Sequence, residues 1–181
     1  MSVITYFSTH NHNLSTPSRI LAMEYLIKNE VSATTFIDAI YFVEEKQKIV
    51  LFHVLDMMVE HHINYLDNYL DFYLEKALKE THESTKRCVS RTLYHQLKNN
   101  KSRYNTKQKQ QIILAMFDWI ILPSAVATRV NAIHVLYFLV DEEEWIKEQL
   151  IALIEQNMQL HEASFVSRGK KILKLLHKRK S

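Results

Sequence analysis

Apolar residues recur at three- and four-residue intervals along most of the chain, which is the period of an amphipathic helix. In residues 46–61, for example, Ile49, Phe52, Leu55 and Val59 fall on one helical face. Segments with this pattern alternate with short polar stretches. They predict nine helices, at residues 18–29, 33–45, 46–61, 63–79, 83–98, 106–122, 124–140, 142–156 and 162–178. The pattern therefore predicts an all-α fold.

Residues that begin or end helices mark several of these boundaries. Pro17 suits the first turn of the first helix, and Ser32 can cap the second. Pro123 ends the helix before it, because the residue that precedes a proline disfavours helical geometry. Asp141 can cap the eighth helix. Residues 1–16 are polar, with many His and Asn, and are expected to form a loosely held N-terminal arm.

A short phrase recurs along the chain, in which a hydroxyl or amide residue and a basic residue introduce an apolar helix. It begins at Ser18, Gln47, Thr85, Thr128 and Ser167, and the last four starts are nearly evenly spaced. A period near forty in a helical chain indicates stacked helix pairs. We therefore expect one helical-repeat domain over residues 1–181, with about four hairpins and a C-terminal helix, clearest at 83–178.

The composition supports a helical chain and excludes several kinds of chemical site. Hydrophobic residues make up 47% of the 181 residues, so a sizeable core can form, while one Gly and two Pro leave few tight hairpin turns or phosphate-binding loops. The lone Cys88 excludes an internal disulfide and a multi-cysteine zinc site. No secretory signal or membrane-spanning run is visible. A cytoplasmic protein is the expectation.

The stretch from Pro123 to Leu176 resembles HEAT-type and armadillo-type repeats. The resemblance lies in the helix that opens Ser-Ala-Val-Ala-Thr-Arg-Val-Asn-Ala at residues 124–132, followed by Asp141 before its partner helix. It implies a right-handed α-α superhelix that binds a macromolecule along a concave face, without catalysis. Another protein is the partner we favour. The family also implies a structural pair between Arg129 and Asp141, within a ladder of charges between successive units.

The chain also resembles small uncharacterised bacterial helical-repeat proteins, some of which carry the label adenylosuccinate lyase. True lyases of that superfamily use a Gly-Ser-Ser loop with a following Met, Lys and Asn. This chain has no Gly-Ser pair, and its only glycine, Gly169, opens a basic helix. Lyase activity is therefore not expected.

Basic residues concentrate in two islands, residues 86–109 and 168–180, between acidic stretches. If the curvature of a solenoid brought them to one strip, they could bind the phosphates of a nucleic acid, which is the alternative function. The candidate surface residues are Arg87, Arg91, Lys98, Arg103, Lys107, Lys109, Arg168, Lys171, Lys174 and Lys178. Ordinary solvated surface is the competing interpretation.

A third hypothesis rests on Asp118, Trp119 and Arg129, which resemble the residues that alkyl-base DNA glycosylases of HEAT-like fold use to hold bases. A core role for Trp119 is favoured instead, because apolar residues surround it. His134 in its apolar helix, and Cys88, are expected to be core residues rather than catalytic ones. We expect no catalytic residue, cofactor, metal site, small-molecule substrate or membrane partner.

Overall fold

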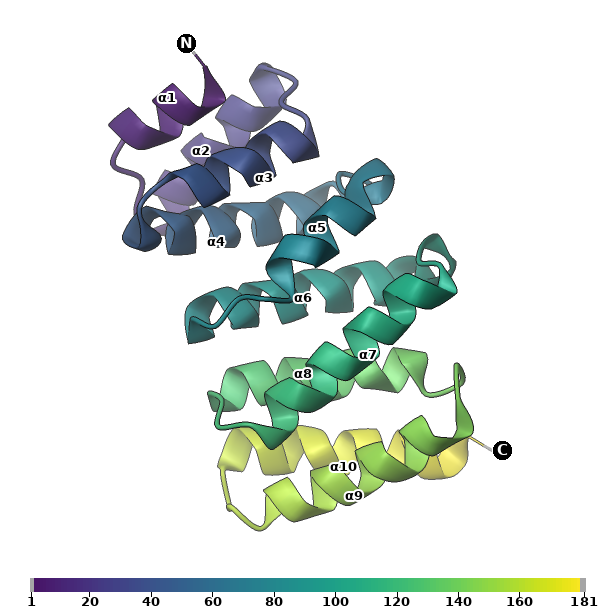
Figure 1. Ribbon diagram of the computed structural model, residues 1–181. Coiled ribbons are helices and arrows are strands. Elements are labelled where there is room, and N and C mark those ends of the chain that lie inside the picture. The colour runs from purple at the N-terminus through teal and green to yellow at the C-terminus, as the bar shows by residue number, and fades with distance from the viewer. Residues whose placement is uncertain (1, 180–181) are drawn as a thin grey trace. The chain divides into compact units, whose positions relative to one another are not determined.

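The computed structural model describes residues 2–179, and all regular structure in that range is helical (Figure 1). Two short 3-10 helices, η1 (Asp67–Tyr69) and η2 (Lys101–Arg103), accompany the α-helices. The α-helices are α1 (Val3–Thr9), α2 (Thr16–Lys28), α3 (Ala33–Phe42), α4 (Glu45–His61), α5 (Leu70–Ala77), α6 (Glu83–Asn100), α7 (Thr106–Ile121), α8 (Val126–Leu139), α9 (Glu144–Met158) and α10 (Ala163–Lys178). The prediction of an all-α fold is confirmed for the described residues.

The chain divides into two compact units, Met1–His95 and Gln96–Ser181, and the boundary falls inside helix α6. The single domain expected over residues 1–181 stays a prediction. In the first unit α1 packs on α3 and α3 packs on α5, while α2 packs on α4. Helix α3 also contacts α4. The odd-numbered and even-numbered helices of this unit therefore form two layers (Figure 1).

In the second unit, helix α8 lies against α7, α9 and α10, and α9 packs on α10. Its buried side chains include Ala132, Ile133, Val135 and Leu136, none of which is measurably exposed. The sequence predicted a helix buried on several sides because residues 132–140 are apolar almost all round, and this is confirmed. Helix α8 is thus the central element of the second unit.

All nine predicted helices are present, but three of them, α5, α8 and α9, begin two or more residues later than expected. Asn64, Asp67 and Asn68 are weak helix formers, and the segment around them makes turns and η1, so that α5 begins only at Leu70. Glu143, and not the expected Asp141, occupies the N-cap position of α9, and its side chain makes no capping hydrogen bond. The predicted cap at Ser32 is confirmed, since its hydroxyl accepts a hydrogen bond from the Thr35 N–H at 3.2 Å.

The N-terminal segment is better anchored than the sequence suggested. Helix α1 is capped by the side chain of Ser2, and Phe7 is buried against Phe36 of α3. The Tyr6 ring stacks on Tyr25 of α2, with 3.4 Å between the ring centroids. A helix as short as α1 shows no clear apolar period, which is why the arm was expected to be loose.

The only glycine of the chain lies inside α10, where that helix approaches α9 closely. A Cβ atom placed on Gly169 would lie 2.9 Å from Cγ2 of Ile154 and 3.1 Å from Sδ of Met158. Such distances are shorter than van der Waals contact, so the missing side chain is what lets the two helices pack. Gly169 therefore allows close packing of two helices within the second unit, and it lies inside α10 rather than at its start.

Among residues 2–179, no helix combines the length and the apolar character that crossing a bilayer requires.

Candidate functional site

Ion pairs between helices join residues that lie far apart in the sequence but within one unit. In every case the base and the acid are separated by roughly thirty to forty positions along the chain, which is close to the period of the recurring phrase. The pairs are Lys48–Glu80, Lys76–Asp38, Arg91–Asp56, Arg91–Glu60, Lys101–Asp141, Lys101–Glu142, Lys109–Glu142, Arg129–Glu162 and Arg179–Asp141. Many charged residues therefore tie neighbouring hairpins together.

Arg129 and Asp141 take part in this network, but with other partners than the expected one. The Arg129 guanidinium donates to Glu162, and its Nη1 lies 2.8 Å from Oδ1 of Asn157. Asp141 instead binds Lys101 at 3.4 Å and Arg179 at 3.3 Å. The direct pair was a wrong prediction, because Arg129 lies in the first turn of α8, beside the first turn of α10, whereas Asp141 follows the C-terminal end of α8.

Much of the first basic island is used in these structural contacts. Lys101 and Lys109 both bind Glu142, and the Lys109 Nζ lies 2.9 Å from that carboxylate. Lys98 and Lys107 are exposed, and Arg103 is half-buried with a hydrogen bond to Asn99. The predicted surface is therefore partly neutralised by acids in this stretch.

The second basic island has a different environment. Helix α10 carries Arg168, Lys171, Lys174 and Lys178 on exposed positions, and no Asp or Glu occurs within its bounds. Burial, together with the charges of Arg168 and Lys171, lowers the pKa of His134 of α8 to about 4. The basic side chains thus adjoin the half-buried His134 of the neighbouring helix. Lys180, which ends the predicted island, lies outside the described residues.

In the first unit, three arginines surround one pocket of about 360 Å³. Arg19 comes from the first turns of α2, and Arg87 and Arg91 come from α6, one helical turn apart. The remaining lining residues are Leu14, His53, Asp56, Ser84 and Cys88. Two of the predicted surface residues, Arg87 and Arg91, are therefore brought together with a third arginine that was not predicted.

The electrostatics of this pocket reflect the concentration of positive charge. Burial and the charges of the three arginines lower the pKa of His53 to about 4, so the imidazole is neutral at pH 7. Burial raises the pKa of Asp56 to about 7, although Arg91, 3.3 Å away, opposes that rise. Asp56 and Glu60, which pair with Arg91, offset at most two of the positive charges of the three arginines. The pocket therefore keeps a net positive charge.

Cys88 lines this pocket and is only 2% exposed. Burial raises the pKa of its thiol well above the usual range, and the neighbouring arginines do not reverse that shift. A protonated, buried thiol is a poor nucleophile. The expectation that Cys88 is a small packing residue is consistent with this environment.

The three residues of the glycosylase hypothesis do not form a common site. Asp118 is exposed on α7, Trp119 is buried, and Arg129 is engaged by Asn157 and Glu162. Between residues 2 and 179, no hydrogen bond or ion pair joins any two of the three. An exposed carboxylate and a buried indole do not make a base-binding groove.

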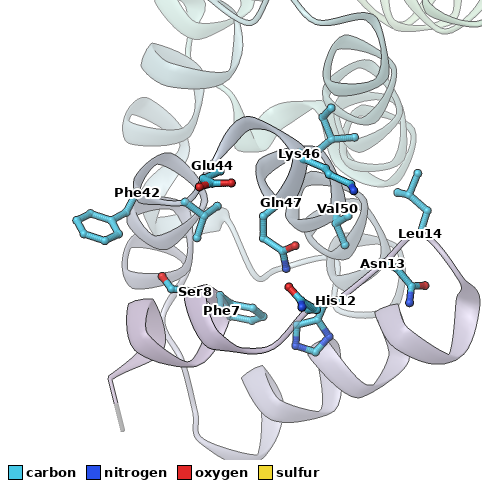
Figure 2. A pocket seen from close by; sticks show the side chains of 13 residues that line it. Phe7, Ser8, His12, Asn13, Leu14, Phe42, Glu44, Lys46, Gln47 and Val50 are labelled. Atoms are coloured by element: carbon cyan, nitrogen blue, oxygen red, sulfur yellow. The ribbon is translucent and has the colours of Figure 1, made fainter.

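A second, larger pocket of about 730 Å³ lies between α1, the segment before α2 and the first turn of α4 (Figure 2). Phe7, His12 and Gln47 face its interior, while Phe42 points outward and is 69% exposed. Its charged lining residues, Glu44 and Lys46, are of opposite sign. The residues that line this pocket show no convergent charge and no cluster of catalytic groups.

Comparison with protein-family models, with curated proteins and with solved structures finds no significant match. The candidate site is accordingly defined by the chemistry of its residues.

Arg19 and His53 were missed by the sequence reasoning, although a signal for them exists. The interval from Arg19 to His53 equals that from His53 to Arg87, and the three come from the consecutive even-numbered helices α2, α4 and α6. Equivalent positions of a repeat fall on one face when helix pairs stack. The recurring phrase contains two of these residues, Arg19 and Arg87, and so marks the rim of the pocket.

Proposed function

We propose that this protein binds nucleic acid through the basic face of helix α10 in its second unit, without catalysing a reaction. The main support for this proposal is the distribution of charge between the helices of that unit. Helix α10 presents Lys and Arg without any acid, whereas α9 exposes Glu144, Glu148 and Glu155. A one-sided basic surface attracts the phosphate backbone, and the acids keep the α9 side out of contact.

The spacing of the basic residues suits a backbone contact. Arg168, Lys171, Lys174 and Lys178 lie on exposed positions of α10 and span about ten residues, which is roughly 15 Å at about 1.5 Å per residue. Double-stranded DNA carries one phosphate charge per about 1.7 Å of its axis, so several phosphates lie within this reach. Each neutralised phosphate releases condensed counterions, and affinity then falls steeply with salt.

Binding to short oligonucleotides tests the proposal. Fluorescence anisotropy with duplex DNA, single-stranded DNA and RNA should show binding at about 20 mM salt that weakens as salt rises, with a slope set by the number of phosphate contacts. A variant with Lys171, Lys174 and Lys178 changed to Gln should lose most of the affinity. The slope of log affinity against log salt concentration should become shallower by about three.

A matched control shows whether the loss of affinity comes from this face of α10 or from the loss of positive charge as such. Changing Lys28, Lys46 and Lys79 to Gln removes the same charge from exposed positions of the first unit, and should leave affinity nearly unchanged. Equal losses in the two variants, or no binding to any oligonucleotide at the low salt concentration, would contradict the proposal.

We further propose that the helix pairs form a HEAT-type solenoid with a right-handed superhelical twist. Two observations support this: the ion pairs between residues about one repeat apart, and the two layers of alternating helices in the first unit. Small-angle X-ray scattering tests it, since a solenoid gives a larger radius of gyration than the value of about 16 Å expected for a globular protein of this length.

A protein partner is the second candidate, favoured by a different surface. Leu114 and Ile121 lie two turns apart on α7 and are 62% and 63% exposed, and Trp145 of α9 is 42% exposed. Exposed apolar residues that gather on one surface are typical of protein interfaces. If nuclease treatment of a native lysate leaves the captured partners unchanged, and Leu114→Ser releases them, a protein partner is the better explanation.

A further inference from the structure

The arginine pocket of the first unit holds one guanidinium group, that of Arg19, which its protein contacts do not fully satisfy. The Arg19 Nε is buried and has no hydrogen-bond partner among residues 2–179, while its Nη2 reaches only the Thr16 hydroxyl, at 3.3 Å. A buried donor without a partner costs free energy. Such a group in a polar pocket indicates a ligand that accepts hydrogen bonds.

The other two arginines differ in how they are held. Arg91 is fixed by His95, Asp56 and Glu60, and its Nη1 lies 3.3 Å from the Asp56 carboxylate. Arg87 is exposed at the rim, one turn earlier on the same helix. Arg19 reaches the pocket from α2, so donors approach from two helices. A phosphate monoester offers three acceptor oxygens and a charge of about −1.5 to −2, against two oxygens and one charge for a carboxylate, so it suits donors that approach from two helices.

The pocket also offers donors other than arginine. Ser84 lies in the first turn of α6, where the helix dipole favours negative charge, and it lines the cavity. A volume of about 360 Å³ is at the lower end for small-molecule sites, and leaves room for a phosphate and a small group esterified to it.

We propose that this pocket is a binding site for a phosphate monoester dianion. Arg19 and Arg87 are the direct donors, Ser84 adds a hydroxyl, and Arg91, held by its acids, completes the positive rim. The neutral imidazole of His53 is a further donor from α4. This site is separate from the basic face of α10, and the proposal stands or falls independently of nucleic-acid binding.

Isothermal titration with inorganic phosphate tests it, at pH 7.5 and at an ionic strength held constant with chloride. We expect saturable binding that Arg19→Gln weakens by at least about tenfold. Arg87→Gln, at an exposed position, should weaken it similarly. The control Lys28→Gln removes the same charge from the same helix as Arg19, and should bind phosphate as the wild type does.

Further ligands identify the kind of molecule that carries the phosphate, and a separate measurement checks that each variant is folded. A 5′-phosphorylated oligonucleotide, its 5′-hydroxyl counterpart and glycerol phosphate distinguish a nucleic-acid end from a small ester. Acetate should not compete. Circular dichroism of each variant checks that the helices remain. The proposal is overturned if phosphate gives no heat beyond that of chloride, or if both arginine variants, still helical, bind phosphate as tightly as Lys28→Gln does.

Discussion

Arg129 of α8 donates to Asn157 near the C-terminal end of α9, with 2.8 Å between Nη1 and Oδ1. The same guanidinium binds Glu162, the residue before α10, and its Nε donates to the Ser124 carbonyl at 3.1 Å. One side chain therefore links the start of α8 to both helices of the next hairpin. Because Arg129 is only 7% exposed, these contacts are shielded from water.

Replacing Arg129 should be costly for stability. Arg129→Met leaves the partly buried Glu162 and the Asn157 amide without their partner, and we expect a loss of about 2–4 kcal/mol in the free energy of unfolding. Arg129→Lys keeps the charge but loses the fork of donors, and should recover only part of this. Urea unfolding measures both, with the exposed Arg168→Met as control. A loss in Arg129→Met no larger than that of the control would contradict the structural role.

Adding one methyl group at Gly169 should also destabilise the second unit. The close approach to Ile154 makes Gly169→Ala an overpacked variant, with a typical cost of about 1–3 kcal/mol. Alanine gains about 1 kcal/mol in helix propensity over glycine. The net loss should be up to about 2 kcal/mol by denaturant unfolding. Ser167→Ala, exposed on the same helix, supplies the control, and a net gain in Gly169→Ala would show that α9 and α10 can separate without cost.

Acid should weaken the protein through its half-buried histidines. The pKa of His134 is lowered from its usual 6.5 to about 4, so its contribution to stability is complete above pH 6.5 and is lost as the pH falls toward 4. Between pH 7.5 and 5 the loss is about 1–2 kcal/mol, the lower figure allowing for solvent screening of a half-buried ring. In His134→Asn the loss over that range should shrink accordingly, whereas His177→Asn, at an exposed position, should follow the wild type. Identical pH dependence in all three proteins would refute the assignment.

The anchoring of helix α1 can be tested at Phe7. This side chain is 1% exposed and packs on Phe36, so Phe7→Ala should cost about 3 kcal/mol, locally or globally. Hydrogen exchange of the α1 amides should speed up accordingly, and limited proteolysis should then cut before residue 16. Ser8→Ala on the exposed side is the control. Unchanged exchange in Phe7→Ala would mean that the segment is as loosely held as the sequence suggested.

The helices were predictable because their apolar stripes are long and regular, as in α4 and α7. Two kinds of element were not. Helix α1 is held by aromatic contacts of Tyr6 and Phe7 with other helices, and these are tertiary. The delayed start of α5 depends on the low helix propensity of Asn64 and its neighbours, which a good apolar period in residues 65–78 concealed.

The site was predicted only in part. Arg87 and Arg91 were recognised as candidates by local charge density, but local density cannot show that Arg19 lies beside them. The partner of Arg129 was mispredicted for a related reason. Acids are available at both Asp141 and Glu162, and only the position of Arg129 in the first turn of α8 decides between them. Which acid pairs with which base depends on how neighbouring helices are aligned along one another. A single sequence defines that alignment only loosely.

The ion pairs between helices have a consequence for how the chain folds. Each of them closes a loop about one repeat long, so each requires only two neighbouring hairpins to be in place. The entropy lost on closing such loops is modest and nearly the same at every step. If the chain forms the solenoid proposed above, folding can begin at any hairpin and spread along it, at the speed typical of proteins whose contacts are local.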